Sequence, residues 1–187
     1  MNTQQLNTEK FKELLLYISD KNKENPRFGS VVLNKMLYYS DFGWYALTGK
    51  SITGDTYIRK DLGPVPKHLL GIREQLINEG MLDKKEVVYF GRNQVRVVPT
   101  QTPEPKLLTE PEIQFVDSII DQIYNLNGQQ ISEITHRELS WNILSNDEEV
   151  PYFTMFLRYV NPIPKDTMTW AKEVVGGVRK RRVAEVG

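Results

Sequence analysis

The 187-residue sequence contains no cysteine and only two histidines, and its charges cancel. The absence of cysteine excludes disulfides, thiol catalysis and thiolate metal sites, and it fits a reducing cytoplasm. Two histidines without a His-Glu-X-X-His motif make zinc a poor prediction. Because 24 basic and 24 acidic residues balance, no global field draws the protein toward nucleic acid or a membrane. We therefore expect no metal and no cofactor.

Long apolar runs and glycine-rich runs are also missing. No stretch approaches the ~20 apolar residues that a transmembrane helix needs. The polar N-terminus does not have the form of a signal peptide. The sequence has no phosphate-binding loop and no Gly-X-Ser-X-Gly nucleophile elbow. These absences favour a cytoplasmic globular protein that is not an enzyme and has no membrane partner.

The residues that are present predict a mainly α fold. Apolar residues make up 40% of the chain, and 9 Tyr, 7 Phe and 3 Trp can fill a core. Helical spacing and end signals predict four helices and a later helical run. Two β-rich segments around a Gly91-Arg92-Asn93 turn predict one small hairpin. The expected elements are a helix capped by Thr8, a helix from Ser30 to Leu47, a helix from His68 to Glu79, strands 86–90 and 94–98, a helix capped by Thr109 with Phe115, Val116, Ile119, Ile120 and Ile123 inside, and a run from Ile131 to Leu144.

The helix from Ser30 to Leu47 is apolar on most of its circumference. Such a helix is usually surrounded by others, so we expect it at the centre of the domain, with Phe42 and Trp44 packed inside. Lys35 lies among its apolar residues, and we expect it to pair with a carboxylate such as Asp55 or Asp61. A polar-tipped stripe has two interpretations, internal packing or a partner surface, and it consists of Asn34, Tyr38, Asp41 and Tyr45.

Two loop features can each be interpreted as structural or as functional. The corner Gly63-Pro64-Val65-Pro66 is rigid, and with the preceding Asp55 it either orients the next helix or forms a surface that a partner recognises. His136 lies near Glu138 and Ser140, but closeness in sequence is not triad geometry, so we expect a structural histidine. A small enzyme that uses Asp41, Asp55 and His136 is the least favoured hypothesis.

The helix from His68 to Glu79 and the following hairpin resemble a winged-helix unit. In such units the helix reads the DNA major groove. The helix and hairpin carry few cationic residues, too few to neutralise several phosphates. A DNA-binding transcriptional regulator is therefore the alternative function rather than the first, and nucleic acid is not the expected partner.

The order of these features resembles one known family. Lys35, the aromatic helix up to Gly49, Gly54-Asp55, the Gly-Pro-X-Pro corner, Ser132 to Glu138, Trp141 and Val150-Pro151-Tyr152 together resemble the Panacea domain, the SocA-like antitoxin domain of bacterial and phage toxin–antitoxin pairs. The resemblance covers about residues 30–155 of a domain at 1–164. Residues 165–187 form an extension with a helical pattern and then a basic tail.

The resemblance implies an antitoxin that neutralises a cognate protein toxin by direct binding, without catalysis. It does not specify the oligomeric state. The partner-binding residues that we expect are Tyr38, Asp41, Tyr45, Asp55, Gly63, Pro64, Pro66, Trp170, Arg179 and Arg181. The motif residues that we expect to be structural are Lys35, Phe42, Trp44, His136 and Trp141.

Overall fold

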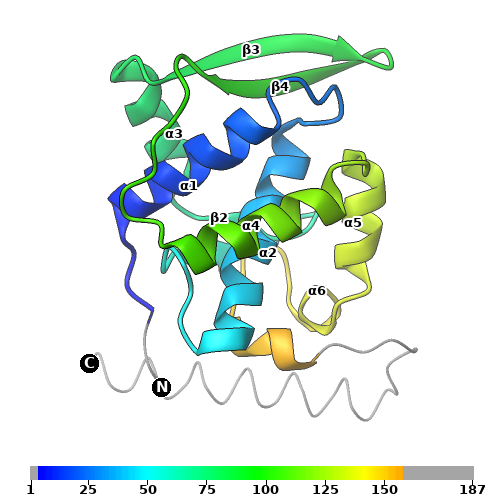
Figure 1. Cartoon of the computed structure of the whole chain (residues 1–187). Helices are drawn as coiled ribbons and strands as arrows, with labels where there is room; N and C mark the ends of the chain where they lie inside the picture. The colour runs from blue at the N-terminus through cyan, green and yellow to red at the C-terminus, as the bar shows by residue number, and fades with distance from the viewer. Residues whose placement is uncertain (1–3, 158–187) are drawn as a thin grey trace.

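Helix α2, Ser30–Thr48, runs through the middle of the molecule, as its apolar circumference predicts (Figure 1). The computed structural model describes residues 4–157, apart from the side chain of Arg92. Met36, Leu37 and Phe42 of α2 are completely buried. Gly49 ends the helix in the left-handed conformation, with φ +77°. The helices packed against α2 are α1 (Thr8–Lys21), α4 (Glu110–Ile123), α5 (Gly128–His136) and the 3-10 helix η1 (Tyr152–Leu157).

The helix starts follow local capping chemistry. Thr109 and Glu112 form the capping box that precedes α4, with Thr109 N–H donating to Glu112 Oε2 at 2.8 Å. At α1 the prediction is off by one residue, because the cap is Asn7 and not Thr8. The Asn7 side chain accepts from the backbone N–H of Lys10 at 3.0 Å.

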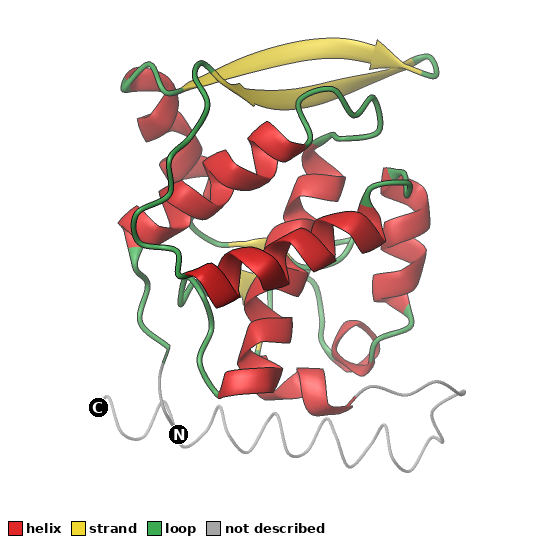
Figure 2. Ribbon diagram, viewed as in Figure 1, coloured by secondary structure: helices red, strands yellow, loops and turns green. Residues whose placement is uncertain are grey.

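A hairpin lies across one end of the molecule, above α1 in Figure 2. It follows α3 (Leu69–Asn78), which packs on β3. Its strands, β3 (Leu82–Tyr89) and β4 (Arg92–Pro99), are longer than predicted. The turn is also shifted: Phe90 and Gly91 form it, because Tyr89 still pairs with Arg92.

A second, three-stranded sheet was not predicted from the sequence. Its central strand β1 (Tyr57–Ile58) pairs antiparallel with β2 (Val65–Pro66) and with β5 (Glu149–Val150). Two-residue strands are too short to show alternation, so only the tertiary pairing defines them.

The predicted helical run from Ile131 to Leu144 is broken. Helix α5 ends at His136, and α6 (Leu139–Ile143) begins after Glu138, whose backbone is extended. The break brings the Glu138 side chain into the interior, where Tyr38 and Tyr39 donate to it.

In the part of the chain that the structure describes, no helix is long and apolar enough to cross a bilayer.

Candidate partner-binding site

The corner from Asp61 to Pro64 is held by side chains from two helices. Lys35 Nζ of α2 donates to the Pro64 carbonyl at 3.2 Å. From α5, the Ser132 hydroxyl is shared between the Gly128 carbonyl of its own helix at 2.8 Å and the Leu62 carbonyl at 3.1 Å, and His136 Nε2 donates to the Asp61 carbonyl at 2.9 Å. Three corner carbonyls therefore have side-chain donors, and we call Lys35, Ser132 and His136 the corner clamp.

Gly63 is required at the centre of this corner. Its φ is +97°, a conformation that side chains disfavour. A Cβ there would lie 2.6 Å from Lys35 Cε and 2.6 Å from Thr135 Oγ1. Gly63, Pro64 and Pro66 are buried, so the exposed residues of the corner are Asp61 and Leu62.

The charge of Lys35 is almost completely desolvated, since the residue is 1% exposed. Burial lowers the pKa of Lys35 from 10.5 to about 7, and the negative charge of Glu138 opposes the shift. The expected carboxylate partners are wrong: Asp55 contacts His68, and Asp61 contacts Asn146. The carboxylate that stabilises the charged lysine is Glu138, which lies far away in the sequence.

Glu138 joins the clamp to the two tyrosines of α2. Tyr38 OH donates to Glu138 Oε2 at 2.7 Å, and Tyr39 OH donates to Oε1 at 2.9 Å. Burial, and then the charge of Glu138, raise the pKa of Tyr38 well above 10. Tyr38 is therefore a neutral donor in the core, where a partner cannot reach it.

Asp41 holds the loop that precedes β1 through hydrogen bonds. Its carboxylate accepts from Thr53 N–H at 2.7 Å, Thr53 Oγ1 at 2.5 Å and Tyr57 OH at 2.8 Å. Burial raises the pKa of Asp41 from 3.8 to about 6, although these hydrogen bonds favour the charged form. The carboxyl group is inaccessible to a partner.

Asp55 organises the start of α3. Its carboxylate contacts His68 Nδ1 at 2.5 Å and accepts from the His68 backbone N–H at 3.2 Å. A carboxylate at this position complements the positive end of the helix dipole. Tyr152 OH donates to the Asp55 carbonyl at 2.7 Å, which connects η1 to the same loop.

His136 and Trp141 form a separate stack. Their ring centroids are 4.0 Å apart at 26°, and the Arg59 guanidinium lies 4.4 Å from the centroid of the Trp141 ring. His136 is thus oriented by Trp141 and by the Asp61 carbonyl. His136 and Trp141 therefore pack against each other next to the corner.

The three residues of the enzyme hypothesis have different partners. Asp41 binds Thr53 and Tyr57, Asp55 binds the start of α3, and His136 stacks on Trp141. None of the three lines either of the two hollows described below. Within residues 4–157, no group of three histidine or acidic residues could hold a metal ion.

Of the two interpretations of the polar-tipped stripe on α2, internal packing describes its two middle residues, Tyr38 and Asp41, which were also expected to bind a partner. Tyr38 and Asp41 are 0% exposed, because α5, α6 and the loop before β1 cover that side of α2. Asn34 and Tyr45, at the two ends of the stripe, are half-buried, and Tyr45 packs on Tyr152 and Phe156. Trp170, Arg179 and Arg181 lie outside the described residues.

An apolar groove of about 510 Å³ opens beside the buried network. Its floor is α2 at Tyr39 and Gly43, and its walls are α4 and α5. Gly43 lets the Phe115 ring approach α2, since a Cβ there would lie 2.7 Å from Phe115 Cζ. Leu47 and Ile134, at its edge, are 69% and 42% exposed. The other lining residues are Ile119, Gln122, Ile123, Leu126, Ile131, Arg137, Glu138 and Met155.

Sequence reasoning missed this groove. Phe115 and Ile119 were expected inside with the rest of the α4 apolar residues, but Val116, Ile120 and Ile123 are the buried set. The only feature of the sequence that could have indicated the groove is the apolar stripe on α4. It is wider than the face that a helix buries against one core.

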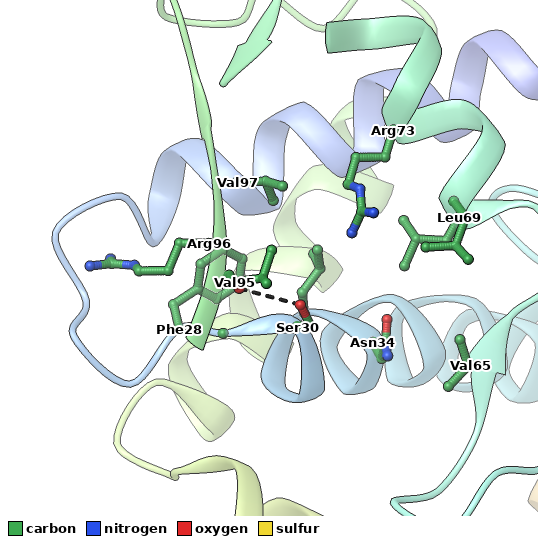
Figure 3. Close-up of a pocket in the computed structure, with 12 residues that line it drawn as sticks. Phe28, Ser30, Asn34, Val65, Leu69, Arg73, Val95, Arg96 and Val97 are labelled. Atoms are coloured by element: carbon green, nitrogen blue, oxygen red, sulfur yellow. Dashed lines mark hydrogen bonds between the residues drawn. The ribbon is translucent and has the colours of Figure 1, made fainter. Parts of the chain in front are cut away.

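A smaller hollow of about 180 Å³ lies where α2, α3 and β4 meet (Figure 3). Arg73 of α3 and Asn34 of α2 reach into it between apolar walls that include Leu69, Val95 and Val97 (Figure 3). Ser30 Oγ donates to the Val95 carbonyl at 3.3 Å. This hollow has room for a single side chain, whereas the groove has room for several.

Comparison with protein families gives a match over much of the chain. The profile described as "Antitoxin SocA-like, Panacea domain" matches residues 33–142, more than half of the chain. The protein belongs to the SocA-like Panacea family. No match was found among curated proteins or among solved structures.

The matched Panacea span is narrower than the expected 30–155. It runs from α2 to α6 and contains the whole corner clamp, Gly63 and Trp141. Helix α1 and the closing Val150-Pro151-Tyr152 lie outside it. The residues that suggested the Panacea family therefore hold α2, the corner and α5 together, and most of them are internal.

Proposed function

We propose that this protein is the antitoxin of a toxin–antitoxin pair and neutralises its toxin by direct, stoichiometric binding. The observation that carries the proposal is the apolar groove between α4 and α5 in a chain of the SocA-like Panacea family. The candidate reactive residues Asp41, Asp55 and His136 are engaged in internal hydrogen bonds. Recognition without chemistry is the simplest function for such an arrangement.

The groove is the surface on which we place the toxin. Protein interfaces gain most of their affinity from a few buried apolar or aromatic anchors in a well-formed pocket. Leu47 and Ile134 are exposed at the groove edge, and Phe115 forms one wall. Because the lining is mostly aliphatic, we assign it an amphipathic helix of the toxin, bound through its apolar face.

The charges around α3 and the hairpin favour this function over DNA binding. Lys67 lies 3.7 Å from Glu149, and Lys84 lies 3.6 Å from Glu86. The Arg96 guanidinium donates to the carbonyls of Lys23 and Asn25 at 2.9 and 2.8 Å. Arg73 reaches into the small hollow (Figure 3). Among the described side chains of this unit, few cations therefore remain for phosphates.

The decisive experiment co-expresses the protein with the product of the adjacent gene and then purifies the pair. We expect the neighbour alone to stop growth, the pair to grow, and the two proteins to co-purify. Ile134→Glu and Leu47→Glu place charge in the groove and should weaken the complex at least ~10-fold.

Leu70→Glu is the matched control, since Leu70 is 62% exposed on α3 and lies outside the groove. It should leave the affinity unchanged. A neighbour that is harmless alone, or that forms no complex with the purified protein, contradicts the antitoxin function. A complex that tolerates both groove variants contradicts only the assigned surface.

A further inference from the structure

The turn of the hairpin has a residue that its backbone disfavours. Tyr89 pairs with Arg92, so Phe90 and Gly91 alone form the two-residue turn. Both have positive φ, +47° and +71°. Turns of this kind favour Asn, Asp or Gly at both positions, because a Cβ is crowded at positive φ. Gly91 fits its position, and Phe90 does not.

Within residues 4–157, no packing of Phe90 compensates for this conformation. The side chain is 90% exposed, and its ring contact is the neighbouring Tyr89, with centroids 4.7 Å apart at 90°. Val88, two residues earlier, is 73% exposed. The tip therefore presents an apolar surface to solvent at a cost in backbone energy. When a residue has an unfavourable backbone conformation and no packing in the fold compensates for it, a functional reason for the residue is expected.

The charges beside the tip indicate which class of partner it meets. Asp83, Lys84, Lys85 and Glu86 balance one another near the far end of β3, and Arg92 is the only charged residue in the sequence of positions 87–95. A single cation is too few to hold the phosphates of DNA or of an anionic bilayer. An exposed aromatic ring on a short, hydrogen-bonded hairpin instead has the properties of an anchor for a protein pocket.

We propose that the hairpin tip, Val88 to Gly91, is a second docking element that inserts Phe90 into an apolar pocket of the toxin. This inference rests on the proposed antitoxin function. In Figure 1 the turn projects past the helices, on the side where α5 lies. A toxin bound in the groove would then also contact the hairpin tip.

The test uses Phe90→Asn, because asparagine suits the turn and removes the ring. With the full-length chain, we expect the thermal midpoint to rise by about 2–4 °C. The dissociation constant for the purified toxin should rise by at least ~30-fold, the loss typical of an anchor residue. Phe90→Tyr keeps the ring and should bind like the wild type.

Leu107→Asn is the control for removal of an exposed apolar side chain elsewhere, since Leu107 is 46% exposed outside the hairpin. It should not change the affinity. If the wild type binds the toxin and Phe90→Asn binds equally well, the tip is not an anchor, although the antitoxin function stands. A lower midpoint for Phe90→Asn overturns the conformational argument. If the wild type binds no toxin, both proposals fail.

Discussion

At the residue scale, Gly63 connects the corner with two helices. Its φ is +97°, and a Cβ added there would lie only 2.6 Å from Lys35 Cε, so alanine would be strained in both backbone and packing. We expect Gly63→Ala to lower the free energy of unfolding by about 2–5 kcal/mol, measured by urea denaturation.

Gly71→Ala in α3 is the control for this substitution. A Cβ at Gly71 would meet nothing within 4 Å, so alanine should stabilise the helix by about 0.5–1 kcal/mol. Equal urea midpoints for the wild type and Gly63→Ala would show that the corner adapts to a side chain at little cost, which would contradict a rigid corner clamp.

Asp41 gives the stability a pH dependence whose sign follows from its raised pKa. Because the folded-state pKa is about 6 and the unfolded value about 3.8, the folded protein binds the extra proton between these values. Stability from this group is therefore present at low pH and is lost as pH rises through 6.

The variant Asp41→Asn cannot take up this proton. The difference in unfolding free energy, wild type minus Asp41→Asn, should grow by about 1 kcal/mol between pH 7.5 and pH 5. Denaturation of both proteins at the two pH values measures it, and the other ionisable groups cancel in the difference. A constant or shrinking difference would mean that Asp41 stays ionised in the fold.

At the element scale, α2 is the helix on which the other elements depend. Phe42 is completely buried and stacks on Tyr152, with centroids 4.3 Å apart at 22°. We expect Phe42→Ala to cost about 2–5 kcal/mol through the cavity that it leaves, measured by urea denaturation. Leu47→Ala, on the same helix but 69% exposed, should change stability by less than about 0.5 kcal/mol. Similar losses for both variants would contradict the central role of α2.

The elements also differ in how well local patterns predicted them. Helices α2, α3 and α4 lie where periodicity and caps placed them, since each signal acts within a few residues. The break at Glu138 and the sheet of β1, β2 and β5 were missed. Both depend on contacts with distant segments, namely Tyr38 and Tyr39 for Glu138 and β5 for β1.

At the scale of the whole molecule, the remaining question is the part played by residues 165–187. We predict that truncation after Pro164 leaves the thermal midpoint unchanged and weakens toxin binding, since residues 165–187 lie outside the family match. Calorimetric melting and titration of the toxin measure the two effects. Unchanged affinity would confine recognition to the domain itself.

Local patterns in the sequence were enough to predict that the chain is mainly α, that α2 is central, and that it carries the Panacea motifs. These properties follow from periodicity, caps and short ordered motifs, which are local. The packing of distant segments places Lys35 under the negative charge of Glu138, not of Asp55 or Asp61, and makes Tyr38 and Asp41 internal. Tyr38 and Glu138 are 100 residues apart in the chain, and the groove is lined by α2, α4, α5 and η1. Such contacts depend on how the helices pack, which no local pattern encodes.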